Sequence, residues 1–237
     1  MIAPLVSLVS VLLIGCGGGG SGGTGGTGGT GGNPPSTYTS LVANVPAATY
    51  TADNAAIYSQ LNIVRGSANS GLLSQNTNLD AAAAHHADFL VNNSLVSNLT
   101  YLTTSFNGIL GGHYESSTYD NVSLTGFIGA TPAARATYAG YSGSVTEEVS
   151  FGAASGADCI ASLLNSVYHL ADLLSPVEQV GVAFNAGNVS GNTGGSACVI
   201  ELGMPTTTLG QLAATGATAV YPANNQTGVP TTYFTAS

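Results

Sequence analysis

Two histidines and a pair of glutamates are the residues of this chain whose types could support chemistry. His113 lies in the glycine-flanked stretch ILGGHYES, His169 lies in NSVYHLADLLSP, and Glu147 and Glu148 stand between them. Two imidazoles and a carboxylate can hold Zn²⁺ or a related divalent cation with an open position, and they could equally act as a general acid/base pair. The intervals from 113 to 147 and from 147 to 169 match no motif, so a hydrogen-bonded structural cluster is an equally strong interpretation.

The two adjacent glutamates are expected to point in opposite directions. Residues 145–152, VTEEVSFG, have the composition of a short strand, in which successive side chains alternate between the two faces. We expect Glu147 to face inward between His113 and His169, and Glu148 to face outward, where Glu148→Gln would have little effect. An inward carboxylate needs a partner, because burying an unpaired charge is costly.

The other two histidines are expected to be structural or solvated. Residues 77–93, TNLDAAAAHHADFLVNN, predict a helix, and His86 falls on its apolar stripe with Leu79, Ala83 and Leu90. A histidine on such a stripe is more often a hydrogen-bonded core residue than a ligand. His85 points another way and is expected to be in water.

The charge balance excludes nucleic acid as a partner. Only 5% of residues are charged, the net charge is −9, and Arg65 and Arg135 are the only basic side chains. A nucleic-acid-binding protein needs lysine and arginine to displace counterions from phosphate. Attraction to an anionic lipid surface is excluded for the same reason.

The N-terminal residues indicate a lipoprotein leader. Residues 2–15 form an apolar run that is too short to span a bilayer comfortably, and the run ends in Leu13-Ile14-Gly15-Cys16. This resembles a bacterial lipobox, although the basic segment that usually precedes the apolar run is missing. We therefore expect a signal peptide over residues 1–16, lipidation at Cys16, and an extracytoplasmic protein whose lipid anchor to a bacterial membrane is its only membrane contact. The alternative is a fortuitous cysteine.

Composition divides the remaining chain into three parts. Residues 17–45 begin with a glycine-rich stretch that cannot bury apolar area, and they predict a flexible tether. Residues 46–205 are expected to fold. Residues 206–237 show no clear core pattern and could be a tail or the start of a truncated β domain.

The two cysteines after Cys16 predict a disulfide. Cys159 and Cys198 are an even number in an oxidising compartment, where pairing is the default. A metal pair is the alternative, but no second cysteine or histidine lies near either at ligand spacing.

Periodicity and turn residues predict an α+β fold. Residues 94–130 are rich in Gly, Ser and Thr and predict loops. The helices come mainly first and a strand pair comes last, which favours α+β layering over βαβ repeats. The predicted helices are residues 52–65, 77–93, 131–140 and 155–167, and the predicted strands are residues 145–152, 178–187 and 196–204.

Several of these segments, in order, resemble the CAP superfamily, also called SCP-like. LNIVRGSANSGLLSQ with the following helix is similar to the family's opening, ILGGHYES to its first histidine segment, ATYAGYSGSVTEEVSFG to its glutamate segment, and NSVYHLADLLSPVEQVGVAF to its second histidine segment. The resemblance implies a CAP-type α-β-α sandwich over residues 46–205 with a shallow central cavity lined by His113, Glu147 and His169. Glu148 replaces the family's usual Asn, Ser166 stands where eukaryotic members have a second Glu, and Leu170 replaces an Arg.

Three functions remain open at this point. The first is an extracytoplasmic binding module for a small apolar ligand or a surface partner. The second is a metal-dependent, peptidase-like hydrolase, in which His113, Glu147 and His169 hold a divalent cation such as zinc. The third is a purely structural surface domain. Catalysis is left undecided, because no nucleophile elbow, phosphate loop or HExxH signature is present.

Overall fold

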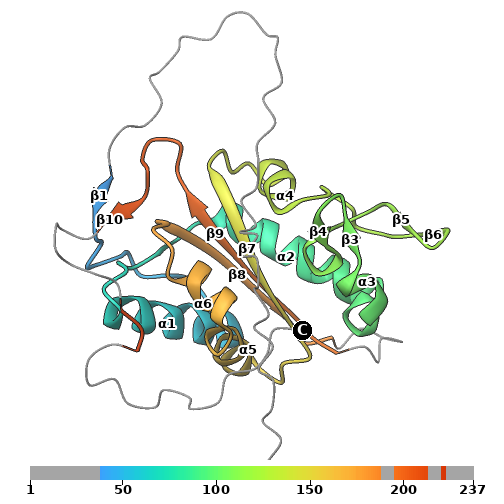
Figure 1. The fold of residues 1–237 in the computed structure, drawn as a ribbon, viewed down its shortest axis with the longest axis horizontal. Helices are drawn as coiled ribbons and strands as arrows, with labels where there is room; N and C mark the ends of the chain where they lie inside the picture. Colours follow the sequence, from blue (N-terminus) through green and yellow to red (C-terminus); the bar gives the residue numbers. More distant parts are fainter. Residues whose placement is uncertain (1–37, 188–194, 213–219, 223–237) are drawn as a thin grey trace, which may run out of the picture. The chain divides into compact units, whose positions relative to one another are not determined.

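A four-stranded sheet forms the centre of the described chain (Figure 1). The computed structural model describes residues 38–187, 195–212 and 220–222. The strand order is β2-β8-β9-β7, with β2 parallel to β8 and the other pairs antiparallel. The four strands are β2 (Ser74–Gln75), β7 (Ser144–Phe151), β8 (Gln179–Asn185) and β9 (Ala197–Met204). The three strands that the sequence predicted are β7, β8 and β9, and they are confirmed.

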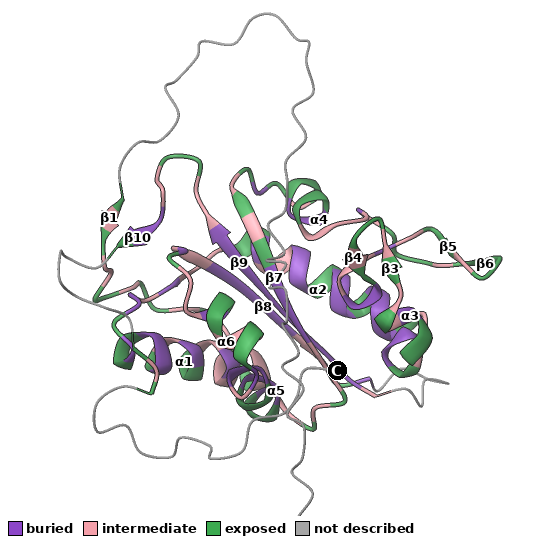
Figure 2. Ribbon diagram, viewed as in Figure 1, coloured by how far each residue is buried: buried purple, intermediate pink, exposed green. Residues whose placement is uncertain are grey.

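Helices cover both faces of this sheet, which confirms the predicted α+β class and its three layers. One face packs against α2 (Thr77–Asn92), and α4 (Pro132–Tyr138) packs on α2 and β7. Three further helices pack on each other and on the strands: α1 (Ala52–Ser67), α5 (Gly156–Leu164) and α6 (Val167–Leu173). The side chains of β9 alternate between the two faces of the sheet. Ile200 packs in the core with α1 and α5, and Val199 packs in the core with α2. The strands β8 and β9 are accordingly buried along most of their length (Figure 2).

The helix α2 is held tightly against the sheet at its N-terminal end. Its N-cap is Asn76, which accepts hydrogen bonds from the backbone N–H groups of Asn78 and Leu79. Asp80 in the first turn accepts a hydrogen bond from the N–H of Val182 on β8 at 3.1 Å. A Cβ on Gly181 of β8 would lie 2.1 Å from the backbone carbon of Leu79. The absence of a side chain at this position therefore allows the helix to approach the strand.

The segment predicted as loops contains a series of short elements. These are η1 (Leu95–Ser97), α3 (Leu99–Thr103), β3 (Ser105–Phe106), β4 (Ile109–Leu110), η2 (Gly111–His113), β5 (Thr118–Tyr119) and β6 (Val122–Ser123). The strands form two hairpins, β3-β4 and β5-β6, whose turns contain residues with positive φ such as Asn107 and Asp120. The turn η2 places His113 against β7.

The ends of the folded part differ from the boundaries expected from composition. β1 (Thr39–Ser40) pairs in parallel with β10 (Gln211–Leu212), so residues of both the predicted tether and the predicted tail take part in the fold. The buried side chain of Gln211 fixes this pair: its amide donates to the carbonyls of Leu72 and Val177, and its oxygen accepts from the N–H of Val42. The predicted signal peptide, lipobox and lipidation site at Cys16 lie outside the described residues.

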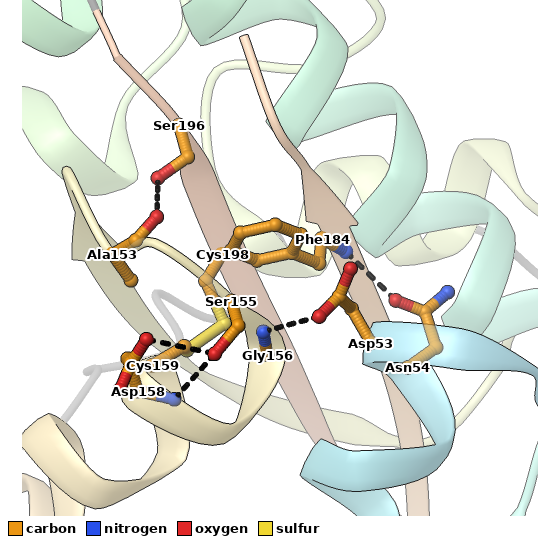
Figure 3. The surroundings of a disulfide bond; sticks show 10 residues. All are labelled: Asp53, Asn54, Ala153, Ser155, Gly156, Asp158, Cys159, Phe184, Ser196 and Cys198. Atoms are coloured by element: carbon orange, nitrogen blue, oxygen red, sulfur yellow. Dashed lines mark hydrogen bonds between the residues drawn. A yellow bond between two sulfur atoms is a disulfide. The ribbon is translucent and has the colours of Figure 1, made fainter.

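The predicted disulfide is present and joins α5 to β9 (Figure 3). Cys159 and Cys198 are both fully buried. The N-terminal end of α5 is fixed twice more, because Ser155 caps it through the N–H of Asp158, and Asp53 of α1 accepts a hydrogen bond from the N–H of Gly156 at 2.7 Å. The helix that leads toward His169 is therefore attached to the sheet and to α1.

Arg65 links the end of α1 to the end of α6, and its partners among the described residues are all backbone carbonyls. Its guanidinium is fully buried and donates to backbone carbonyls, including those of Leu173 at 2.6 Å and Ser175 at 2.9 Å. Burial lowers the pKa of Arg65 to about 10, so the side chain stays charged at neutral pH.

Candidate functional site

The edge strand β7 sends its two glutamates to opposite faces of the sheet. Glu147 faces α2 and α4, whereas Glu148 faces the side of α6. Both residues are buried, with Glu147 at 7% and Glu148 at 3% of full exposure. The expectation that Glu148 faces outward is wrong, because helices cover both faces of this sheet.

Glu147 is held as a carboxylate by an arginine and a histidine. Its Oε2 lies 2.5 Å from Nη2 of Arg135, and its Oε1 lies 3.0 Å from Nδ1 of His113. Burial alone would raise the pKa of Glu147, but Arg135, with His86 and His113, holds that pKa well below its usual range. A permanently ionised carboxylate is thus fixed against one nitrogen of the His113 ring.

Arg135 holds His113 at two points. Besides binding Glu147, both of its terminal nitrogens lie 3.2 Å from the backbone carbonyl of His113, and Nη1 reaches the carbonyl of Gly129 at 3.4 Å. Burial would lower the pKa of Arg135, but Glu147, Glu201 and Glu115 raise it. One fully buried guanidinium therefore positions both the backbone of His113 and the carboxylate that orients its ring.

His86 holds the segment on both sides of His113 through its two ring nitrogens. Its Nδ1 lies 2.9 Å from Glu115 and its Nε2 lies 2.9 Å from the carbonyl of Gly112, and the side chain is fully buried. The expectation that His86 is a core residue is confirmed, and His85 is exposed as expected. His86 thus fixes the residue that precedes His113, and its Nε2 also lies 3.7 Å from Oε1 of Glu147.

Glu201 on β9 adds a second buried carboxyl beside Glu147. The two residues face each other across the β7–β9 ladder, and Glu201 is fully buried. Burial, followed by the charge of Glu147, raises the pKa of Glu201 well above its usual value. Both effects favour the neutral form of Glu201 beside the carboxylate of Glu147.

On the other side of β7, His169 lies beside Glu148. The nearest atoms, Nε2 of His169 and Oε2 of Glu148, are 3.6 Å apart. Burial, with Asp172 as the second cause, raises the pKa of Glu148 to about 9. Burial and the nearby His113 lower the pKa of His169. At neutral pH this half of the site consists of a neutral imidazole and a protonated carboxyl.

The structure brings together part of the predicted set. His113 and Glu147 are in contact, whereas His169 is paired with Glu148 and not with Glu147. Within the described ranges there is no group of three or more His, Cys, Asp or Glu side chains that could hold a metal ion. The geometry thus lends no support to a metal centre made of His113, Glu147 and His169, which stays a prediction.

Four residues of the site were missed by reasoning from the sequence: Glu115, Arg135, Asp172 and Glu201. A signal existed for Arg135, because a chain with two basic residues and eleven acidic ones is expected to use each cation against a buried carboxylate. No comparable signal existed for Glu201, whose strand reads as an apolar one apart from this residue.

The arrangement provides two half-exposed imidazoles on either side of one strand. The side chains of His113 and His169 are 29% and 30% exposed, and the glutamate side chains beside them are nearly inaccessible. With Nδ1 of His113 bound to Glu147, its Nε2 has no hydrogen-bond partner among the described residues and can accept from or donate to a ligand.

Comparisons with known proteins leave the family open. No family model matches the chain, and no curated protein matches it. Among solved structures, the chain is similar to an outer surface protein from Borrelia burgdorferi, with a TM-score of 0.44 and 19% identity, over 65% of this chain and 92% of that one. So distant a similarity carries no argument, and the CAP resemblance stays a prediction.

Proposed function

We propose that this protein is an extracytoplasmic binding module whose ligand contacts His113 and His169. One observation carries the proposal: each ring is half-exposed, and a buried glutamate from adjacent positions of β7 lies beside each of them. His113 is held by its hydrogen bond to Glu147, so its ring loses little conformational entropy when a ligand binds. A small apolar ligand or a surface partner with a hydrogen-bonding group would fit such a pair.

The proposed location outside the cytoplasm rests on two features. The sequence begins with an apolar run that ends in a lipobox-like cysteine, and the fold contains a buried disulfide. Structural disulfides persist in oxidising compartments. None of the helices described is both long and apolar enough to span a membrane. Lipid anchoring at Cys16 predicts that Cys16→Ala moves the protein from the membrane fraction to the soluble fraction; retention in the membrane fraction would contradict it.

A fragment screen observed at the histidines tests the binding function. The imidazole Cε1 resonances of isotope-labelled protein would be followed by NMR while a fragment library is added. Fragments that shift His113 and His169 together, but not the exposed His85, support the proposal. If every fragment leaves His113 and His169 unmoved, or moves His85 equally, the histidine pair is no binding site.

A hydrolase is the second candidate, and one contact favours it. The carboxylate of Glu147 on Nδ1 of His113 fixes the ring and leaves Nε2 facing a ligand, which is the arrangement of an oriented general base. Such an enzyme would hydrolyse ester or peptide substrates, and His113→Gln would remove the activity while the protein stays folded. Equal rates for the wild type and this variant would leave binding as the only candidate.

A further inference from the structure

Among the described residues, no strand pairs with the outer edge of β7. It lies at the end of the strand order β2-β8-β9-β7, and it pairs only with β9 in the part of the chain that is described (Figure 1). Its sequence, SVTEEVSF, is rich in β-branched residues and contains neither the proline nor the lysine that often protects an edge strand. Such an edge presents backbone groups to which a further strand could bond.

The register shows which backbone groups are free. Gly152, which follows β7, donates its N–H to the carbonyl of Ser196 at 3.0 Å, so the pair 152–196 is a hydrogen-bonded pair of the ladder. In an antiparallel ladder such pairs alternate, so the even-numbered residues of β7 bond to β9. The odd-numbered residues, Val145, Glu147, Val149 and Phe151, therefore direct their N–H and C=O groups away from β9. None of these groups has a hydrogen-bond partner among the described residues.

The free edge runs through the candidate site. Glu147 is one of the four outward-directed residues, and its side chain contacts His113, while the next residue, Glu148, lies beside His169. A strand added along β7 would consequently lie near both half-exposed imidazoles. Its backbone would bond to the edge and its side chains would alternate toward the two histidines.

Charge indicates which kind of strand would fit. Both arginines are fully buried and the chain has no lysine, so the surface carries no permanently cationic side chain. The exposed side chain of Asp172 lies beside Glu148 on one side of the edge, and the chain as a whole has a net charge of −9. A basic peptide meets no like charge here, whereas an acidic one would be repelled.

We propose that β7 accepts an extended, basic peptide segment of a partner protein as an additional strand. The inference rests on the proposed binding function and names its ligand class. Affinity would come from the backbone groups of Val145, Glu147, Val149 and Phe151, and the preference for basic side chains would come from the acidic surroundings of the edge.

Amide hydrogen exchange on the full chain tests this directly. The probe is a capped peptide of alternating lysine and threonine, long enough to lie along Val145–Phe151. In the free protein the amides of Val145, Glu147, Val149 and Phe151 should exchange faster than those of the even-numbered residues. Adding the peptide should slow the odd-numbered amides and leave the even-numbered ones unchanged. Protection of the odd-numbered amides before any peptide is added would overturn the proposal, because the edge would already be occupied.

A matched peptide serves as the control. N-methylation of two adjacent central residues blocks hydrogen bonding on both edges of the peptide and keeps its charge, so binding should weaken about tenfold or more. Equal binding of both peptides would show a merely electrostatic contact. On the protein side, Val145→Pro removes one outward N–H without touching the ladder to β9, and should weaken binding about three- to tenfold relative to Val145→Ala.

The outcomes separate the two proposals. If fragments shift His113 and His169 but the peptide never protects the odd-numbered amides, strand addition fails and the binding function stands. If neither fragments nor peptide produce a response, the binding function fails as well.

Discussion

Arg135 makes several separate interactions in the candidate site. It neutralises Glu147, binds the backbone of His113, and lies among Glu115 and Glu201 with no exposure to solvent. Removing one partner of a buried ion pair leaves the other charge uncompensated, which is far more costly than losing an exposed pair.

We therefore expect Arg135→Met to destabilise the fold by ~3–5 kcal/mol, measured by urea unfolding at neutral pH. The loss should shrink in acid, where protonation relieves the unpaired Glu147. Arg135→Lys keeps the charge but not the two-pronged geometry, so it should fall between the wild type and Arg135→Met. A loss that does not depend on pH would mean that the arginine acts through packing and not through its charge.

The buried carboxyl of Glu148 predicts a loss of stability as the pH rises from about 4.5 to about 9. Its folded pKa is raised from 4.5 to about 9, so the folded state binds this proton more tightly than the unfolded state does. The stabilisation that this proton provides is complete below the pKa of Glu148 in the unfolded state. It is lost as the pH rises toward the pKa in the folded state, by up to ~1.4 kcal/mol per pH unit. Glu148→Gln cannot ionise and should remove this pH dependence. The unfolding free energy of the variant should therefore rise relative to that of the wild type between about pH 6 and about pH 9.

The matched control is Asp120→Asn, which removes an exposed carboxyl from the β5-β6 turn. Its pH profile should follow that of the wild type. If Glu148→Gln also follows the wild type, the carboxyl of Glu148 is better solvated than its burial indicates.

At the scale of elements, the disulfide is the strongest link between α5 and the sheet. In the chain-entropy description, a crosslink closing 39 residues stabilises the fold by ~4 kcal/mol. Replacing both Cys159 and Cys198 by Ala should lower the unfolding free energy by about that amount. Because both sulfurs are buried, a mild reductant should leave the native protein unchanged and act only once the protein unfolds. Rapid reduction of the native protein would contradict this.

The long helices and strands could be predicted from the sequence, whereas the two-residue strands could not. Periodicity located α1, α2 and the three main strands to within a few residues. The two-residue strands carry no periodicity, and the β1–β10 pair depends on the side chain of Gln211, about 170 residues from its partner segment. The break between α5 and α6 at Asn165 and Ser166 was also missed, because one apolar face continues across it.

The residue types of the candidate site could be predicted from the sequence, but not all of the contacts between their side chains. His113 and Glu147 were expected to meet, and they do. Alternation placed the two glutamates correctly on opposite faces, but it could not show that helices bury both faces. The partners Arg135 and Glu201 come from other elements and are brought to β7 by tertiary packing alone.

At the scale of the whole molecule, the surface is acidic and polar without cationic partners. The net charge of −9 arises from eleven acids and two arginines, and both arginines are used inside. Stability should consequently rise modestly with ionic strength, because salt screens repulsion among the exposed carboxylates.

The burial of both arginines also makes the chain a poor substrate for one class of protease. Trypsin cuts after lysine or arginine, and the bonds after Arg65 and Arg135 are the only two of this kind in all 237 residues. Both sites lie in helices, with their side chains fully enclosed. Trypsin should therefore leave the native protein intact and cut it into three fragments only when it unfolds, so the cleavage rate would report unfolding itself. A protein with this property would persist where trypsin-like enzymes degrade proteins that expose lysine or arginine.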